Sequence, residues 1–97
     1  PVKRHNDQSI KEVLQQLVEH YRWKGRLHQS RIRELWADRM GTTINQYTRE
    51  IKIIRRKLYI TIDASALKQE LHYGRDKIRE MVNEELGEDF IEEVVVR

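Results

Sequence analysis

Residues 58–63 alternate strictly between apolar and polar side chains, and this pattern constrains the fold more than any other feature of the chain. The segment is Leu-Tyr-Ile-Thr-Ile-Asp, the period-two arrangement of a strand with one buried face. A second apolar segment, residues 51–54, precedes it across Arg55, Arg56 and Lys57. We therefore predict a β-hairpin with three adjacent cations at its tip. Such a projection suits a polyanion or an acidic protein surface better than chemistry on a small molecule.

The turn of this hairpin runs against a local preference. Two-residue hairpin turns need positive φ at both central residues, and they favour Asn-Gly or Asp-Gly. Arg55 and Arg56 would be strained there, so we expect a slightly longer turn with a bulge.

Two helices are predicted before the hairpin. Ser9 and Glu12 have the spacing of a capping box, and Gly25 stands where the first helix should end in a left-handed residue. The apolar side chains of this helix fall on one stripe, which consists of Ile10, Val13, Leu14, Leu17, Val18 and Tyr21. The second helix is expected over about residues 29–40, and an extra helical turn over residues 42–47.

After the hairpin, we predict a third helix and a closing strand. Ser65 can cap the helix, which reaches about Leu86 and is ended by Gly87. Gly74 lies on its apolar stripe, which indicates close approach of a neighbouring backbone; a kink is the alternative. Residues 90–97 are typical of a strand.

These elements predict one α+β domain over residues 1–97, with residues 1–7 as a flexible lead. The order is α-α-β-β-α-β, with a three-stranded sheet and the helices packed on one face. The chain has no cysteine, and its histidines lack metal-ligand spacing, so we expect no metal, no cofactor and no enzymatic site. Because no signal peptide or apolar run of about 20 residues appears, we expect a cytoplasmic protein without a membrane partner.

Charge is distributed unevenly along the chain. Residues 22–57 carry eleven basic and three acidic side chains, a net charge of +8, whereas residues 58–97 carry five and ten, a net charge of −5. The basic segment predicts a nucleic-acid-binding surface. Its candidate residues are Arg22, Lys24, Arg26, Arg49, Lys52, Arg55, Arg56 and Lys57, with Tyr59 beside them. A merely solvated surface and head-to-tail self-association are the alternatives.

Three aromatic residues have different interpretations. Trp36 lies on a helical stripe and is expected in the core. Trp23 stands between two cations near a predicted helix end, and both a core position and an exposed ring remain open. Tyr59 faces away from Leu58 and Ile60, so it is expected on the uncovered face of the sheet, where a base could stack or a cross-strand pair could form.

The order of several short segments resembles the DciA family over about residues 8–97. The resemblance rests on Ser9-Ile10 and Val13-Leu14, Trp36 and Met40-Gly41, residues 58–62, Glu70-Leu71, Asn83, Gly87 and residues 94–97. It implies a domain like the K-homology (KH) fold and a role as accessory or loader of the bacterial replicative helicase, with affinity for single-stranded DNA. KH modules grip nucleic acid with a Gly-x-x-Gly loop, and the glycines of this chain never have that spacing.

The leading hypothesis is therefore a non-enzymatic replication accessory that binds single-stranded DNA weakly, without sequence preference, through its basic surface. The alternative is a protein-interaction module that docks on an acidic surface, of the replicative helicase or of a second copy, without binding nucleic acid.

Overall fold

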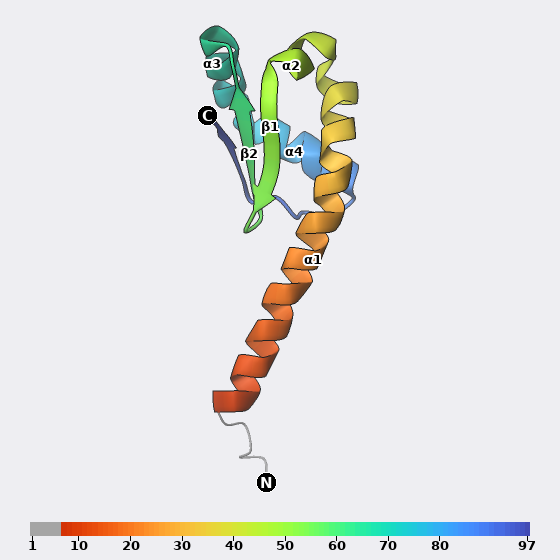
Figure 1. Ribbon diagram of the computed structural model, residues 1–97, viewed down its shortest axis with the longest axis vertical. Helices are drawn as coiled ribbons and strands as arrows, with labels where there is room; N and C mark the ends of the chain where they lie inside the picture. The colour runs from red at the N-terminus through yellow and green to blue at the C-terminus, as the bar shows by residue number, and fades with distance from the viewer. Residues whose placement is uncertain (1–6) are drawn as a thin grey trace.

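A long helix that projects from a small sheet gives the molecule its shape (Figure 1). The computed structural model describes residues 7–97, and the side chains from residue 9 onward. The elements are α1 (Asp7–Met40), α2 (Thr42–Tyr47), β1 (Thr48–Ile54), β2 (Lys57–Ile62), α3 (Ser65–Tyr73), α4 (Arg75–Leu86) and β3 (Glu93–Val96). Of the lead expected over residues 1–7, Asp7 belongs to α1 and the rest lies outside the described residues.

The predicted α+β architecture is confirmed. The sheet has the order β1-β2-β3. β1 pairs with β2 in antiparallel orientation, and β3 returns parallel to β2 after α3 and α4. The apolar residues of β2 are buried and alternate with half-exposed ones, as the period-two pattern predicts. The extra turn expected over residues 42–47 is α2.

The two helices predicted before the hairpin are one continuous helix, so the predicted end at Gly25 is wrong. Gly25 lies inside α1 without positive φ, and Ser9 is already two residues inside the helix instead of capping it. Lys24 and His28, one turn apart on either side of Gly25, both contact the carboxylate of Glu88 at 2.8 Å. These shared contacts fix the helix across the glycine, whose presence costs only about 1 kcal/mol relative to alanine.

The hairpin turn is also tighter than predicted. Ile54 pairs directly with Lys57, and the two residues between them have φ values of 52° and 66°. This is the two-residue geometry with both central residues left-handed. The bulge lies instead at the start of β1, where the register shifts between Thr48 and Glu50.

The helix predicted over residues 65–86 is broken into α3 and α4. Gly74 ends α3 and precedes α4, with φ −92° and ψ 13°, so the kink is the correct interpretation. A Cβ at Gly74 would meet only backbone oxygens of its own helix, at 3.7 and 3.9 Å, and the predicted close approach of a neighbour is wrong. Ser65 is the first residue of α3 and makes no capping hydrogen bond. Gly87 ends α4 in the left-handed conformation, as predicted.

The core lies between one face of the sheet and the helices α1 and α4. Trp36 and Ile32 of α1 are fully buried, together with Leu58 and Ile60 of β2 and Val82 of α4. Trp36 donates a hydrogen bond from Nε1 to Thr48 Oγ1 at 3.0 Å. The core position predicted for Trp36 is therefore confirmed. Trp23 is exposed, so of its two interpretations the exposed ring is correct and the core position is wrong.

Side chains of α1 also cover the outer edge of β1. Gln29 donates from Nε2 to the carbonyl oxygen of Ile51 at 2.6 Å and accepts at Oε1 from the Ile53 N–H at 2.7 Å. Arg33 donates to the Thr48 carbonyl at 3.3 Å. The edge strand is therefore fastened to the C-terminal half of α1.

Within residues 7–97, none of the helices is both long and apolar enough to cross a membrane.

Candidate nucleic-acid interface

A groove of about 740 Å³ separates the hairpin tip from the middle of α1. Its apolar wall consists of Val18 and Tyr21 of α1, Ile53 and Ile54 of β1, and Phe90. Arg22 and Arg26 approach it from α1, one turn apart on the same helix face, and Arg55 approaches it from the turn. Arg56, the other residue of the turn, also lines it. The groove therefore combines apolar surface with four guanidinium groups; we call it the arginine groove.

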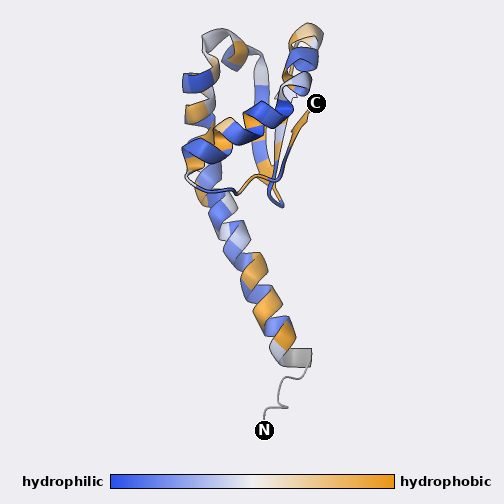
Figure 2. Cartoon of the chain, turned by 180° about the vertical axis from the view of Figure 1, so that it is seen from behind, coloured by the Kyte–Doolittle hydropathy of each residue, from blue (hydrophilic) through white to orange (hydrophobic). Residues whose placement is uncertain are grey.

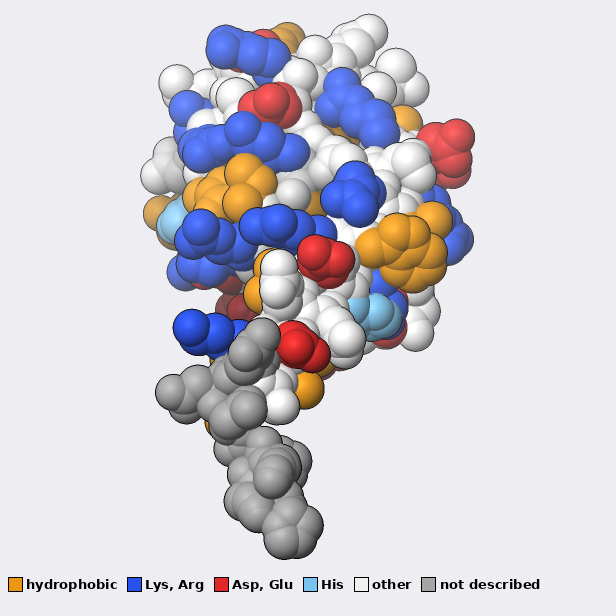
Figure 3. Space-filling view, turned by 60° about the horizontal axis from the view of Figure 1, so that its bottom comes forward, with side chains coloured by type: hydrophobic (Ala, Val, Ile, Leu, Met, Phe, Trp, Pro, Cys, Tyr) orange, Lys and Arg blue, Asp and Glu red, His pale blue; other side chains and the backbone are white. Residues whose placement is uncertain are grey.

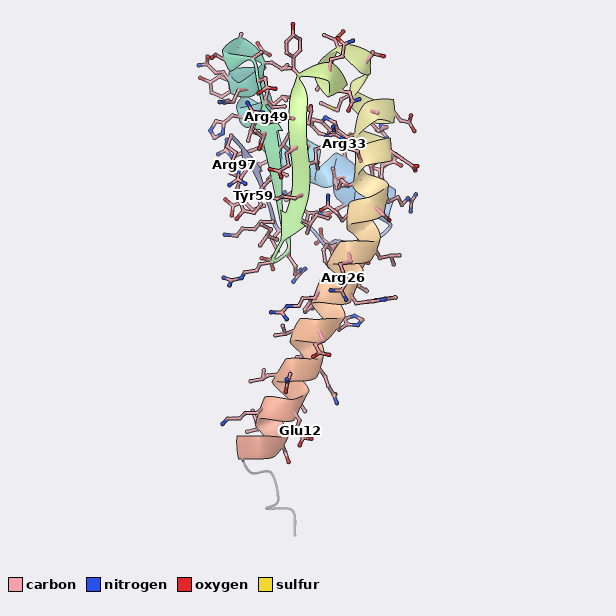
Figure 4. The ribbon with its side chains drawn as sticks, viewed as in Figure 1. Glu12, Arg26, Arg33, Arg49, Tyr59 and Arg97 are labelled. Atoms are coloured by element: carbon pink, nitrogen blue, oxygen red, sulfur yellow. The ribbon has the colours of Figure 1, made fainter. Side chains whose placement is uncertain are left out.

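Arg22, Arg26 and Arg55 are exposed, and none of these three arginines forms an ion pair with another side chain in the part of the chain that the structure describes. Figure 3, in which the lower end of the molecule comes forward, shows basic side chains gathered around hydrophobic ones, with acidic side chains dispersed among them. Figure 4 labels Arg26 on α1 and Arg33 farther along it, beside β1.

Arg56 is held differently from Arg55, its neighbour in the turn. It donates from Nε to the Phe90 carbonyl at 3.0 Å and from Nη2 to the Asp89 carbonyl at 3.2 Å. It also forms an ion pair with Glu92 at 3.0 Å, and its guanidinium lies 4.9 Å from the centre of the Tyr21 ring. These contacts offset the cost of a left-handed arginine, about 1–2 kcal/mol. Arg56 therefore holds the turn against the chain before β3, whereas Arg55 has no ion-pair partner among the described residues.

The other predicted basic residues are paired with acidic side chains. Lys24 contacts Glu88 at 2.8 Å, and Lys57 contacts Glu93 at 3.3 Å. The remaining pairs are Arg49–Asp63 at 2.5 Å and Lys52–Glu50 at 3.8 Å. The basic segment and the acidic C-terminal segment thus neutralise each other where the fold brings them together. Of the eight predicted basic residues, Arg22, Arg26, Arg55 and Arg56 line the groove. Of these four, only Arg56 has a carboxylate partner among the described residues.

Tyr59 lies on the sheet face opposite the core, apart from the arginine groove. It pairs in register with Lys52 of β1 and Val95 of β3. The guanidinium of Arg97 lies 4.6 Å from the centre of its ring, and Figure 4 shows the two side chains together. A base that stacked on this face of Tyr59 would have to displace Arg97.

Glu88 joins the middle of α1 to the chain that follows α4. The ammonium of Lys24 donates a hydrogen bond to its carboxylate, and His28 contributes a second contact, so the pKa of Glu88 lies below its usual value of 4.5. His28 is buried against the Phe90 ring, with 4.9 Å between ring centres. This arrangement fixes one wall of the groove.

The sequence pattern did not reveal the apolar wall of the groove. Phe90 was assigned to the closing strand, but β3 begins only at Glu93, and Phe90 packs beside α1 instead. The four-residue spacing of Arg22 and Arg26 was the available signal, because it places both on one face of a helix. The spacing could be interpreted in this way only if one helix continues through Gly25, as α1 does.

No cluster of three or more metal-ligating side chains occurs among the described residues. The arrangement offers cations beside apolar surface, which suits electrostatic contact with phosphates.

Comparison with known families gave one match. Residues 9–96 match the family model described as Dna[CI] antecedent, DciA. No curated protein matches the chain, and no solved structure matches it either, so the relation to the KH fold stays a prediction.

Proposed function

This chain belongs to the DciA family, and from that premise we propose that it binds single-stranded DNA weakly, and without sequence preference, through the arginine groove. Membership carries a helicase-loader-associated role in DNA replication, and the family is a replication accessory family associated with the replicative helicase. The proposal adds where the chain contacts DNA.

The observation that carries the proposal is the contrast between free and paired cations. Arg22, Arg26 and Arg55 have no carboxylate partner within residues 7–97 and converge on one groove. Lys24, Arg49 and Lys57, by contrast, have carboxylates within 3.3 Å. A phosphate that bound a paired lysine would compete with its carboxylate, whereas a free arginine offers its donors at no such cost.

The aromatic ring beside these arginines adds a second contact. Tyr21 is partly exposed in the groove, and Arg56 lies over one face of its ring. A base would have to stack on the other face, and such stacking on an aromatic ring contributes about 1–3 kcal/mol without strong sequence preference. Three phosphate contacts and one stacking site would give a weak, sequence-independent interaction.

The test is a titration of labelled oligothymidine, followed by fluorescence anisotropy across a salt series. Three phosphate contacts predict a slope of log K against log salt of about −2. The triple variant Arg22→Gln/Arg26→Gln/Arg55→Gln should flatten this slope and weaken binding on the order of tenfold at low salt. Arg22→Gln/Arg26→Gln should show most of the loss.

Lys68→Gln/Lys77→Gln is the matched control for that double variant, because it removes the same charge from exposed positions on α3 and α4, outside the groove. Equal losses in both double variants would show that only net charge matters, and the groove would be refuted as the site.

The alternative function is docking of the basic surface on an acidic protein surface, with no contact to nucleic acid. Three results together would establish this alternative. The chain would capture the replicative helicase even after nuclease treatment, the triple variant would lose this capture, and the chain would not bind oligothymidine.

A further inference from the structure

The N-terminal half of α1 carries an uncovered apolar stripe. It consists of Ile10, Val13, Leu14, Leu17, Val18 and Tyr21, and each of these side chains is 41–56% exposed. Figure 2 shows hydrophobic residues along this part of the helix, well away from the sheet. Contiguous apolar surface of this kind marks an interaction site, because a solvent-facing helix surface is ordinarily polar.

The stripe continues the buried face of the same helix. At 100° per residue, positions 10, 14, 17 and 21 lie within a narrow arc, and His28, Ile32 and Leu35 follow in the same arc. The latter three are buried against the rest of the domain. The helix therefore presents one apolar face along its length, and the domain covers only its C-terminal part.

Charges beside the stripe are asymmetric. Helical geometry places Lys11 and Arg22 along one border of the stripe, and Glu12 and Glu19 on the opposite side of the helix. Arg26 and Arg55 extend the basic border toward the arginine groove, which shares Val18 and Tyr21 with the stripe. A partner on the apolar stripe would therefore meet positive charge along one flank.

A second copy of the chain does not satisfy this arrangement. An antiparallel pair of stripes would bring Lys11 of one copy toward Arg22 of the other, and none of the described side chains on this border, over residues 9–22, is a carboxylate that could compensate. Like charges placed together weaken association and select against the wrong partner.

We propose that the stripe is the docking surface for an amphipathic helix of another protein, whose apolar face is bordered on one flank by Asp or Glu. From Ile10 to Tyr21 the stripe is about 17 Å long, so a partner helix of about three to four turns would cover it. Pairing of two such helices would bury the apolar residues of both, in the manner of helix-in-groove and coiled-coil recognition. This inference does not depend on DNA binding.

The test uses a designed peptide as probe, about 18 residues long, with leucines at three- and four-residue spacing, glutamates on one flank and Ala or Gln elsewhere. A second peptide carries lysine in place of each glutamate. Fluorescence anisotropy with the full chain should show binding of the glutamate peptide and at least about tenfold weaker binding of the lysine peptide. Lys11→Glu/Arg22→Glu should reverse this preference.

Leu14→Asp/Leu17→Asp should reduce binding of the glutamate peptide by at least about tenfold, because it places charge in the middle of the stripe. Both leucines are half exposed and outside the arginine groove. The variant should therefore keep its circular dichroism spectrum and its affinity for oligothymidine, which separates this proposal from the proposed function.

Two results would overturn the proposal. Equal affinity for the two peptides would show that the stripe binds apolar surfaces without charge selectivity. The second result concerns the chain without any peptide. If sedimentation shows a dimer at micromolar concentration, and Leu14→Asp/Leu17→Asp abolishes it, a second copy of the chain occupies the stripe.

Discussion

The two halves of α1 share one apolar face, but they stand in opposite surroundings. In the C-terminal half, Ile32 and Trp36 are completely buried. In the N-terminal half, Leu14 and Leu17 expose about half of their surface. The same periodicity thus yields core in one half and accessible surface in the other. Periodicity indicates which face of a helix is apolar, but the rest of the chain decides how much of that face is covered.

The contrast also separates stability from recognition. Side chains of the covered half should determine the free energy of unfolding, whereas those of the projecting half should matter little for it and remain available for binding. We expect substitutions in the covered half to change the free energy of unfolding most, and those at the junction of the two halves least.

Truncation of the largest core side chain should give the largest effect. Trp36→Ala removes a fully buried ring and its hydrogen bond to Thr48, so we expect a loss of about 3–5 kcal/mol in the free energy of unfolding. Leu17→Ala on the projecting half should change it by no more than about 0.5 kcal/mol. Urea denaturation followed by circular dichroism measures both. Similar losses in the two variants would mean that the projecting half is packed in solution.

Loss of the contacts at the sheet edge should come next. Gln29→Ala leaves the Ile51 carbonyl and the Ile53 N–H without their partner, which should cost about 1–3 kcal/mol in urea denaturation. Gln15→Ala on the projecting half is the matched control, since the side chain is exposed, and should be close to neutral. A neutral Gln29→Ala would show that water replaces these hydrogen bonds without penalty.

Replacement of the glycine between the two halves should have the opposite sign. A Cβ at Gly25 would meet no atom within 4 Å, so Gly25→Ala should stabilise the protein by about 0.5–1 kcal/mol through helix propensity. Thermal unfolding reports the gain. Gly41→Ala is the contrasting variant, because Gly41 has φ +90° and alanine would be strained there. A loss at Gly25 would indicate that the helix is interrupted at that point.

The smallest effect should be a pH dependence at the junction of the two halves. The pKa of Glu88 is lowered by the Lys24 and His28 contacts, so its contribution is complete above its unfolded value of 4.5 and is lost as the pH falls through the lowered pKa. Its side chain is 36% exposed, and the contribution should stay below about 1 kcal/mol after screening by solvent.

The measurement is the difference in Tm between the wild type and Glu88→Gln as the pH is lowered from neutral. This difference should shrink through that window. Glu19→Gln, on the projecting half, should show no comparable difference at neutral pH. A difference for Glu88→Gln that is the same at all pH values would exclude the ion pairs as its cause.

Local signals predicted the elements well and their ends poorly. The alternation at Leu58, Ile60 and Ile62 located β2 and its buried face, because strand period follows directly from backbone geometry. Gly25 was predicted to end a helix and Gly74 to lie within one, but Gly25 lies inside α1 and Gly74 separates α3 from α4. Glu88 contacts Lys24 and His28 across sequence separations of 64 and 60 residues and so holds α1 together across Gly25. No local sequence rule contains these contacts.

Long-range contacts also explain what was predicted of the candidate site and what was not. The concentration of positive charge in residues 22–57 was visible at once, but its partial neutralisation was not, because Lys57 meets Glu93 only through the pairing of β2 with β3. The tight turn at Arg55 and Arg56 was unexpected for the same reason, since its anchors are carbonyls near residue 90. Tertiary structure decides which cations are paired with carboxylates, and the cations without such a partner among the described residues form the candidate interface.

The amide of Gln29 has a further consequence for the behaviour of the protein at high concentration. It occupies the Ile51 carbonyl and the Ile53 N–H at the edge of β1, and this hinders another chain from adding a strand there, a common route to aggregation. Strand addition is then left to the side of β3, which is only four residues long. Together with Arg33, which binds the Thr48 carbonyl, this glutamine thus protects a small sheet against growth into larger β-assemblies.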